Sequence, residues 1–415
     1  MRSVMTKDLA TQAPEHLPAT VQTGEEAREP LSAAREAAEP LTAPGIYTFW
    51  RGRVALYAIL KSLGVGAGDS VLVPGYTCFA VPAAVLFTGA LPLYMDIDSD
   101  AFNVTVESAE SAWKASARNR IKAIVIQHTF GLPANLPPIL AWAREHGVAT
   151  VEDCAHCWGS RYLNEHGEWT EVGTAADAAF YSSQWTKPIS TGLGGWARIN
   201  NPDLEAGMRR FYTADCVAPS AAEVATLAGQ VFARSFFSSP WAHWTVRSLY
   251  QWLYMHRLTT GTSTPDELQG KMPRGYAKRM SGYQRRLLQE RLRNSSVQAH
   301  RRRLKNLYDA ALESAGLRAF KIPDYADAVL LRYPIAVADK KRTLAQAERR
   351  RIELGDWYTH PIDRPQDRDA EIFAYRSGAC PRGERAAREI VNLPMHSQVN
   401  ERTVETVVEF LKEVA

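Results

Sequence analysis

Residues 149–160 read ATVEDCAHCWGS, a short β-branched, apolar run that leads directly into acidic and imidazole side chains. Short runs of this kind are typical of buried strands. The polar residues Glu152, Asp153 and His156 come where the predicted strand ends. In sheets of parallel strands, functional groups collect at the carboxyl ends of the strands. This stretch therefore predicts a central strand together with one side of a functional site.

Segments on both sides of this stretch alternate between short apolar runs and helical patterns. Residues 54–60 repeat apolar side chains at helical spacing, so we expect a helix to open at Gly52. Further strands and helices are expected in turn at residues 71–73, 81–87, 91–96, 123–127, 139–146 and 148–153. Such alternation predicts an α/β fold, in which a mainly parallel sheet is flanked by helices on both faces.

Length and composition indicate a globular protein with a large core. The chain has 415 residues, of which 46% are hydrophobic, and a formal net charge of +4. So small a charge argues against a nucleic-acid partner and favours small-molecule substrates. The five cysteines form no regular framework, and the first 17 residues lack a long apolar run. A cytoplasmic location is therefore expected.

Composition also divides the chain into regions. Residues 1–44 are rich in Ala, Glu, Pro and Thr, and we expect a disordered arm there because they cannot bury enough apolar surface. Residues 45–270 are expected to form a large domain, with an aromatic helical insert at about 205–270. Residues 271–415 are expected to form a connecting helix and a smaller α+β domain. Its expected elements are an Arg-rich helix, a strand and two further helices, at residues 283–308, 329–335, 344–354 and 404–414.

A second stretch joins a lysine to hydroxyl groups and a glycine-rich turn. Residues 180–187 read FYSSQWTK, and residues 191–195 read TGLGG. Taken singly, such features are ordinary, because a strand-end Asp often caps a turn, a Lys is usually solvated and paired glycines mark a bend. The order of Asp153, Lys187 and the glycine turn along one chain is much less ordinary.

Separated motifs along the chain resemble, in their order, those of the DegT/StrS family of pyridoxal 5′-phosphate (PLP)-dependent sugar aminotransferases. Three of them are E-D-x-A-H, G-x-x-x-D-A-A-x-F-S and T-K-x-x-x-T-G-x-G-G, here at residues 152–156, 173–182 and 186–195. Other similar segments lie at residues 73–77, 89–90, 96–98, 275–280 and 392–396. The resemblance implies the aspartate-aminotransferase fold, PLP fold type I, with PLP as the cofactor.

The resemblance also implies roles for single residues. Lys187 would carry PLP as a Schiff base and would then act as the base that moves a proton. Asp153 would keep the pyridine nitrogen protonated through a charge-assisted hydrogen bond. His156 would lie next to the cofactor ring, although a lone histidine near a strand end is more often a structural residue.

The phosphate group of the cofactor would lie at the start of the helix that opens at Gly52, where backbone N–H groups and the helix dipole favour an anion. We therefore include Gly52, Arg53 and Val54 among the cofactor-binding residues, with Ser182 as an added hydroxyl donor. The family commonly has Gly-Thr at this helix start, whereas this chain has Gly52-Arg53. A cationic side chain therefore stands where the family has a hydroxyl group.

Two further positions depart from the family pattern. Cys78 stands where the family has an aromatic residue that stacks on the cofactor, which leaves Tyr76 or Phe79 as substitutes. Ala277 and Lys278 stand where the family often has an asparagine that reaches the phosphate of a neighbouring subunit, and Lys278 would replace it. A homodimer is expected, since active sites of this fold normally form at a subunit interface.

A metal site and a membrane contact are weaker interpretations of two other features. Cys154 and Cys157 form one C-x-x-C pair without the second half of a zinc site, so no metal is expected. The aromatic insert is read first as core or dimer interface. Its alternatives are a lid over the substrate or a peripheral membrane contact through residues 231–257.

The implied reaction is transfer of an amino group, from L-glutamate, to a nucleotide-linked keto sugar in polysaccharide or secondary-metabolite biosynthesis. One alternative is a PLP-dependent sugar dehydratase, but dehydratases of this family have a histidine where this chain has Lys187. Another is a non-catalytic PLP-binding regulator or a membrane-associated scaffold of a glycan pathway. The presence of Lys187, Asp153 and Ser182 together favours the enzyme.

Overall fold

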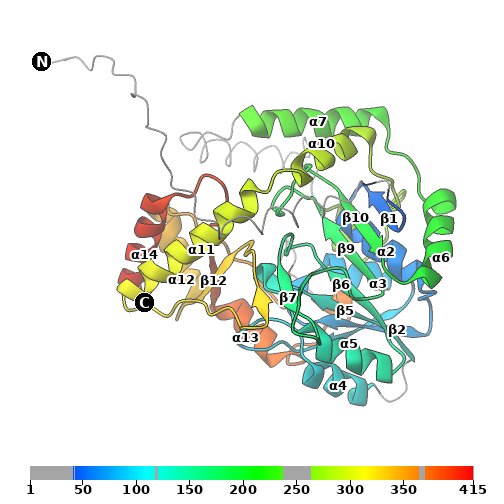
Figure 1. Ribbon diagram of the computed structural model, residues 1–415, viewed down its shortest axis with the longest axis horizontal. Helices are drawn as coiled ribbons and strands as arrows, with labels where there is room; N and C mark the ends of the chain where they lie inside the picture. The colour runs from blue at the N-terminus through cyan, green and yellow to red at the C-terminus, as the bar shows by residue number, and fades with distance from the viewer. Residues whose placement is uncertain (1–40, 42, 117–119, 237–262, 364–369, 415) are drawn as a thin grey trace, which may run out of the picture. The chain divides into compact units, whose positions relative to one another are not determined.

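The computed structural model describes residues 41, 43–116, 120–236, 263–363 and 370–414, and its centre is a seven-stranded sheet (Figure 1). The strands lie in the order β1 (Ile46–Phe49), β10 (Gly195–Ile199), β9 (Ala178–Ser182), β6 (Ala149–Asp153), β5 (Arg120–Gln127), β2 (Asp69–Pro74) and β4 (Leu91–Met95). Strands β4, β2, β5, β6 and β9 are parallel, whereas β10 is antiparallel to both of its neighbours. The predicted mainly parallel sheet is confirmed.

Both faces of the sheet are covered, because successive side chains of a strand point to opposite faces. In β5, Val125 belongs to one hydrophobic cluster, whereas Ile124 and Ile126 belong to another. The first cluster contains helices α2 (Gly52–Ser62) and α3 (Ala80–Leu86), and the second contains α5 (Leu136–Glu145) and part of α4 (Val106–Ala115). Strands buried on both faces are apolar throughout, as the β-branched runs predicted.

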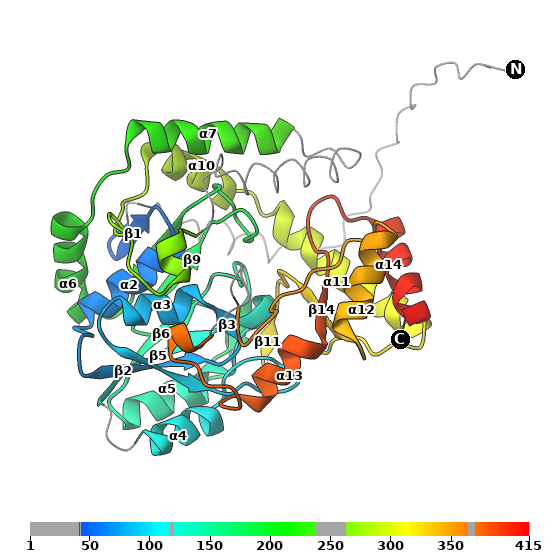
Figure 2. The same cartoon turned by 180° about the vertical axis from the view of Figure 1, so that it is seen from behind.

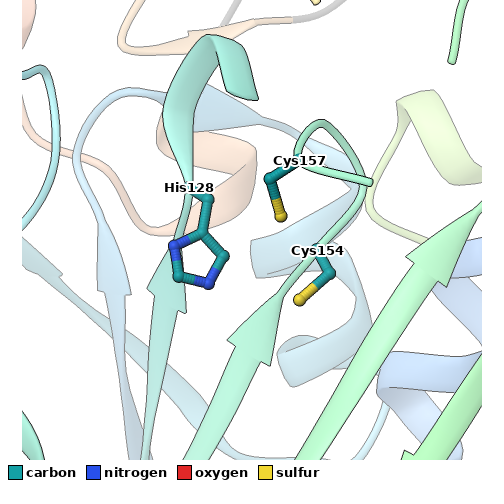
Figure 3. A group of neighbouring side chains, drawn as sticks. All are labelled: His128, Cys154 and Cys157. Atoms are coloured by element: carbon teal, nitrogen blue, oxygen red, sulfur yellow. The ribbon is translucent and has the colours of Figure 1, made fainter. Parts of the chain in front are cut away.

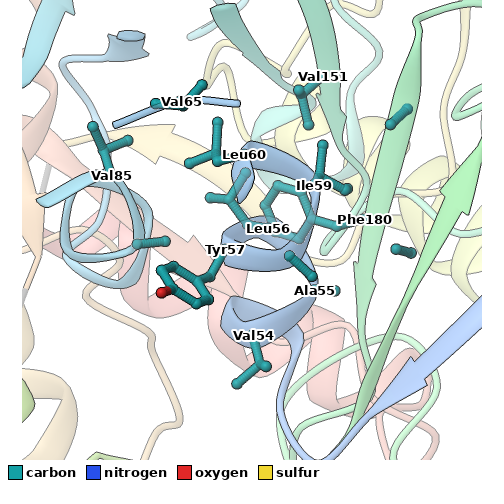
Figure 4. Packing of buried hydrophobic residues seen from close by; sticks show 14 of the residues in the cluster. Val54, Ala55, Leu56, Tyr57, Ile59, Leu60, Val65, Val85, Val151 and Phe180 are labelled. Atoms are coloured by element: carbon teal, nitrogen blue, oxygen red, sulfur yellow. The ribbon is translucent and has the colours of Figure 1, made fainter. Parts of the chain in front are cut away.

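Helix α2 is a core helix that begins beside the sheet's functional edge. Eight of its first nine residues are buried, and its side chains pack on Val151 and Phe180 of the sheet (Figure 4). Its N-terminus touches the backbone of β10, since a Cβ atom placed on Gly195 would lie 2.3 Å from the Cα atom of Gly52. Only glycine permits this approach, which brings the helix start to the end of β9.

The predicted aromatic insert is helical where the structure describes it. Helix α6 (Glu205–Arg210), a π-helical turn (Phe211–Asp215) and α7 (Ala221–Phe236) precede residues 237–262, which lie outside the described residues, and α9 (Pro265–Leu268) follows. Leu227 of α7 packs against Trp50 and Leu193. Most of the segment 231–257, proposed above for membrane contact, therefore lies outside the described residues. Among the helices that the structure describes, none has the length and apolar content needed to span a bilayer.

The long Arg-rich helix predicted over 283–308 is wrong in one respect, because two helices occupy this region. Helix α10 (Gly282–Leu292) ends before α11 (Ser296–Ser314) begins. The side chain of Asn294 accepts a hydrogen bond from the backbone N–H of Ser296 at 3.0 Å. Asparagine competes with helical backbone bonding in this way, which explains the break.

The C-terminal helices lie together with β14 at one side of the ribbon in Figure 2, and this part of the chain has a hydrophobic cluster of its own. It consists of α11, α12 (Lys340–Arg349), α14 (Glu401–Val414) and the antiparallel pair β12 (Tyr333–Ala336) and β14 (Ile390–Leu393). The strand predicted at 329–335 begins only at Tyr333. The helix predicted at 344–354 begins earlier, because the Asp339 side chain caps it by accepting from the Arg342 N–H at 2.9 Å. The domain boundaries themselves remain predictions.

Short strand pairs complete the described elements and connect distant segments. Strand β13 (Ile362–Asp363) is parallel to β3 (Thr77–Cys78), and α13 (Pro381–Glu389) follows it in sequence. A small three-stranded sheet contains β11 (Ala326–Asp327), β7 (Arg161–Leu163) and β8 (Trp169–Glu171). The β13–β3 pair brings the segment before Ile362 to the ends of the central strands.

Candidate active site

A pocket lies where strands β5, β6 and β9 end and α2 begins. It brings together six of the nine predicted site residues, namely Gly52, Arg53, Asp153, His156, Ser182 and Lys187. Three of the predicted residues do not line it: Val54, Tyr76 and Lys278. The pocket also contains residues that sequence reasoning did not select, among them Gln127, Gln184 and Tyr358.

Lys187 lies in the loop between β9 and β10, and hydrogen bonds close this loop at its base. The backbone N–H of Thr191 donates to the carbonyl of Ser183 at 2.8 Å, and their two hydroxyl oxygens lie 2.7 Å apart. A Cβ atom on Gly194 would lie 2.2 Å from the Ser183 hydroxyl oxygen, so this position requires glycine. The T-G-x-G-G motif therefore shapes the loop that presents the lysine.

The amine of Lys187 has an unusually low basicity. Burial in the pocket lowers its pKa to about 8, and the positive charges of Arg332 and Arg53 lower it further, against the opposing effects of Cys78 and Asp153. A lysine with such a pKa is partly neutral near physiological pH. It can therefore act as a nucleophile and as a proton carrier.

Asp153 occupies the last position of β6 and is buried. Burial raises the pKa of its carboxyl group, whereas the backbone N–H of Ala155, which donates to Oδ1 at 3.0 Å, and the charge of Lys187 lower it. The neighbouring Glu152 points elsewhere: its carboxylate accepts from the N–H groups of Gly173 and Ala176 at 2.6 and 3.1 Å. Of the two acids, Asp153 alone faces the pocket.

His156 is a buried imidazole with a spare nitrogen. Its Nδ1 atom has no hydrogen-bond partner among the described residues, and its Nε2 atom lies 3.5 Å from the Tyr358 hydroxyl oxygen. Burial, together with the charges of Lys187 and Arg332, holds the pKa of His156 well below its ordinary value. The ring is therefore neutral and stacks on Trp357 at a centroid distance of 5.4 Å.

Trp357 and Tyr358 form an aromatic wall that no sequence signal identified. The Lys187 Nζ atom lies 4.8 Å from the centroid of the Trp357 ring, and Tyr358 lines the pocket. Tyr76 and Phe79 were the two candidates for stacking on the cofactor, and neither lines the pocket; Tyr76 lies behind this wall. Its hydroxyl group accepts from the Tyr358 N–H at 3.1 Å, and its ring meets the Tyr358 ring edge-on. Tyr76 therefore positions Tyr358 and does not reach the pocket.

The start of α2 is held by a buried carboxylate. Glu267 of α9 forms ion pairs with Arg53 at 2.9 Å and with Arg51 at 3.1 Å. Backbone N–H groups at a helix start lack partners within the helix and attract anions. Val54 does not offer its N–H to an anion, because this group donates to the Arg51 carbonyl at 3.1 Å. The Val54 side chain is part of the core.

Lys278 lies outside the pocket of its own chain. Its amine pairs with Glu223 of α7, and its carbonyl accepts from the Trp50 N–H at 2.9 Å. A role for Lys278 at the site of a neighbouring subunit remains a prediction.

The pocket residues fit PLP. Asp153 is a carboxylate suited to a pyridinium nitrogen, and the spare Nδ1 of His156 is suited to the phenolic oxygen. Ser182 and the start of α2 offer donors to a phosphate, and Lys187 supplies the amine. Each group that the cofactor presents thus has a chemically complementary residue in one pocket.

A cluster of metal-binding residue types lies outside the lining of the pocket. The potential ligand atoms of His128, Cys154 and Cys157 lie within 4.8 Å of one another (Figure 3). Both imidazole nitrogens of His128 are already engaged, since Nδ1 accepts from the Ala134 N–H at 3.1 Å and Nε2 lies 3.0 Å from the Glu152 carboxylate. The histidine therefore has no lone pair to offer a metal.

Fold and pocket together define the class of the protein as a type I PLP fold. Residues 34–232 and 248–412 match the DegT/DnrJ/EryC1/StrS aminotransferase family. The chain therefore belongs to this family, as the motifs predicted.

Curated relatives are similar to this chain over about 160 residues. MosB of Rhizobium meliloti is 36% identical over 38% of this chain and 29% of MosB. The UDP-N-acetyl-3-dehydro-α-D-glucosamine 3-aminotransferase of Acidithiobacillus ferrooxidans is 36% identical, and the GDP-perosamine synthase of Escherichia coli O157:H7 is 34% identical; each match covers 38% of this chain and 41% of the relative. The matched stretch thus spans less than half the length of each of these relatives.

Solved structures share the fold over most of the chain. A DegT/DnrJ/EryC1/StrS aminotransferase from Brucella abortus is 22% identical, covers 92% of this chain and 90% of its own, and has a TM-score of 0.67. A protein from Streptococcus pneumoniae in its PLP form is 18% identical over 92% of this chain and 90% of its own, again with a TM-score of 0.67. The expected type I fold is confirmed.

Proposed function

We propose that this protein is a PLP-dependent aminotransferase that moves an amino group from L-glutamate to the keto group of a sugar. The observation that carries the proposal is the amine of Lys187, which lies with the Asp153 carboxylate in one pocket at the ends of β6 and β9. Family membership supports amino transfer. Two relatives whose names include UDP and GDP sugars support a nucleotide-linked acceptor.

Each pocket residue has a definite part in this chemistry. Bound PLP would supply an electron-withdrawing ring that stabilises negative charge on a substrate carbon. Asp153 would hold a proton on the ring nitrogen, and His156 would donate to the phenolic oxygen through Nδ1. Lys187 Nζ would hold the cofactor and afterwards carry a proton to and from the substrate carbon. Ser182 would bind the phosphate.

Absorption spectroscopy tests the proposal directly. The purified protein mixed with PLP should absorb in the region of roughly 410 to 430 nm that is typical of lysine-bound PLP, and L-glutamate should bleach this band. Lys187→Ala should lose both the band and amino transfer. Lys114→Ala removes an exposed lysine and serves as the matched control. A Lys187→Ala variant that retains both properties would show that the assignment is wrong.

The same spectra separate the proposal from its rivals. A band that forms but does not respond to any amino acid would favour the non-catalytic regulator. Bleaching by L-glutamate followed by recovery of the band with a nucleotide-linked keto sugar would establish both halves of the transfer. Homodimerisation and a cytoplasmic location remain predictions, and sedimentation velocity of the purified protein tests the first of them.

A further inference from the structure

Residues 356–358, which contain the aromatic wall, belong to no helix or strand, and side chains hold their backbone instead. The Trp357 N–H donates to Asn392 Oδ1 at 2.9 Å, and the Tyr358 N–H donates to the Tyr76 hydroxyl oxygen at 3.1 Å. The Tyr76 hydroxyl group donates in turn to the Trp357 carbonyl at 3.3 Å. Both Asn392 and Tyr76 are buried, so these bonds give the two rings of the wall a defined position.

Lys340, the first residue of α12, is a further anchor of this segment. Its side chain is buried, and its amine donates to three backbone carbonyls, those of Asp356 at 3.0 Å, Tyr358 at 2.9 Å and Ala387 at 3.0 Å. Burial lowers the pKa of Lys340 to about 8, against the opposing effects of Asp356 and Asp363. At pH 7 the amine is therefore mainly an ammonium group, with one N–H for each carbonyl. Lys340 thus ties the wall to the last turn of α13.

The hydroxyl group of Tyr358 is a buried donor that faces an imidazole. Burial raises the pKa of this phenol well above its ordinary value, so the group keeps its proton. In the part of the chain that the structure describes, its hydrogen-bond partner is His156 Nε2, at 3.5 Å. His156 is neutral, since burial holds its pKa well below the ordinary value, and a neutral imidazole has one accepting nitrogen. If Nε2 accepts from Tyr358, the imidazole proton lies on Nδ1.

The Nδ1 atom of His156 is the nitrogen that a ligand of the pocket can use. It is buried and has no hydrogen-bond partner among the described residues. With a proton, Nδ1 donates to an oxygen atom, whereas its bare lone pair would repel that oxygen. The position of one proton therefore decides whether His156 attracts or repels the phenolic oxygen of PLP.

We propose that Tyr358 is a positioning residue that keeps the proton of His156 on Nδ1, and that Lys340 holds Tyr358 in the place from which it does so. This inference rests on the proposed function, because the Nδ1–H group matters through the cofactor oxygen that accepts from it. Tyr358 and Lys340 act through His156, and neither has to touch the reacting atoms. Two residues of the C-terminal region thus set the hydrogen-bonding character of a residue at the end of β6.

Nitrogen NMR of the PLP-free protein with isotope-labelled histidine tests the tautomer without turnover. Long-range couplings distinguish a protonated ring nitrogen from a bare one, and the His156 signals are those lost in His156→Gln. The native protein should have the His156 proton on Nδ1, and Tyr358→Phe should lose this preference. Tyr162→Phe, which removes a hydroxyl group outside the pocket lining, is the matched control and should keep it. A native proton on Nε2, or an unchanged tautomer in Tyr358→Phe, would overturn the inference.

The same spectra test Lys340 against its neighbour in the helix. Lys340→Met leaves three carbonyls without their donor, so the wall should shift and the Nδ1–H preference should fall. Lys340→Arg keeps the charge but replaces a tetrahedral ammonium with a planar fork, and it should fall between the two. Lys341→Met removes an exposed lysine of α12 and should behave as the native protein. A native tautomer in Lys340→Met, or in Lys340→Arg if circular dichroism shows that the methionine variant does not fold, would overturn the role of Lys340.

A pH titration of the visible band in the PLP-loaded protein tests the consequence for the cofactor. A donor at the phenolic oxygen stabilises negative charge there and so favours the deprotonated form of the chromophore. Its loss in Tyr358→Phe should raise the midpoint at which the band moves to shorter wavelength by at least about half a pH unit. In a His156→Gln background, Tyr358→Phe should add little to the shift, because Tyr358 acts through His156. Equal shifts in both backgrounds would overturn the inference.

The two sets of spectra separate this inference from the proposed function. If His156 has its proton on Nδ1 only when Tyr358 is present, but no amino acid bleaches the band, the proposed function is wrong and the positioning role stands. If L-glutamate bleaches the band while Tyr358→Phe leaves both the tautomer and the midpoint unchanged, the proposed function stands and the positioning role is overturned.

Discussion

At the scale of single residues, the pocket changes the acid–base chemistry of its lysine. Burial lowers the pKa of Lys187 from 10.5 to about 8. At pH 7.5 about a quarter of such amines are neutral, whereas about one in a thousand ordinary lysines is. The neutral amine is the form that bonds to a carbonyl, so the same residue placed on the surface would react far more slowly.

The rate at which the PLP-free protein captures PLP should therefore depend on pH in a specific way. Protonated Lys187 is unreactive and predominates below its pKa, so the rate should rise with pH and level off with a midpoint near 8. Stopped-flow absorbance between pH 6 and 10, on the order of one measurement per half unit, would show the curve. A midpoint close to 10.5 would mean that the lysine is solvated.

Glu152 shows that adjacent acids can have different purposes. Its buried carboxylate accepts hydrogen bonds from three backbone N–H groups, those of Gly173, Ala175 and Ala176, and contacts His128. These bonds hold the loop that precedes β9, and Asp153 is left for the pocket. The sequence pair Glu-Asp thus divides into one structural and one functional residue.

Replacing Glu152 with alanine should destabilise the fold severely. Three buried donors would lose their acceptor, which should lower the free energy of unfolding by about 3 kcal/mol or more. Denaturant unfolding followed by circular dichroism measures this change. Glu165→Ala, at an exposed position, is the control and should have little effect. Equal midpoints for the two variants would contradict the structural role of Glu152.

At the scale of elements, the site depends on how closely α2 approaches the β9–β10 pair. The helix start and the first residue of β10 are in backbone contact, since a Cβ atom on Gly195 would lie 2.3 Å from the Gly52 Cα atom. The lysine loop spans the same two strands. Any shift of α2 therefore moves the phosphate donors relative to Lys187.

Gly195→Ala should separate these elements. The added methyl group meets backbone and must displace it, so the free energy of unfolding should fall by about 2 kcal/mol and PLP should bind more weakly. Gly229→Ala, in the middle of α7, is the matched control because nothing lies within 4 Å of its added Cβ atom. That control should be neutral or stabilising by up to about 1 kcal/mol. Unchanged PLP binding in Gly195→Ala would contradict the close approach.

At the scale of the whole molecule, the pocket joins segments that are far apart in the chain. It takes residues from Arg51 to Val81, from the ends of β5, β6 and β9, and from Tyr358 near the C-terminal region. A ligand that contacts all of them binds the folded protein only. Such a ligand must therefore raise the stability of the whole chain.

PLP should raise the thermal midpoint of unfolding, and its phosphate should account for part of the effect. A ligand at 100 times its dissociation constant contributes about 2.7 kcal/mol to stability, so a shift of about 2 °C or more is expected. Pyridoxal, which lacks the phosphate but can still bond to Lys187, should have a smaller effect at equal concentration. Equal shifts would show that the start of α2 and Ser182 do not bind the phosphate.

Local patterns were sufficient for the sheet and for α2, whereas the two central site residues were predicted from the resemblance to the family's motifs. Strand and helix periodicities depend on residues that are close together in the sequence. Functional groups collect at the carboxyl ends of parallel strands, so a predicted strand end is by itself a candidate functional site. The resemblance to the family's motifs placed Asp153 and Lys187 in one site before the structure was known, and both line the pocket. The break at Asn294 was missed because a single polar residue, not periodicity, sets this boundary.

The remaining pocket residues were decided only by tertiary structure. Tyr358 reaches the pocket, and Trp357 reaches the Lys187 amine, because β13 pairs with β3, a contact between residues 362 and 77. The same packing turns Tyr76 inward, where its hydroxyl bonds to the arriving segment. The Arg332 guanidinium and the Lys187 amine both lie near one indole ring, that of Trp357. Contacts across such separations depend on how whole elements pack, and no spacing of residues along the chain encodes them.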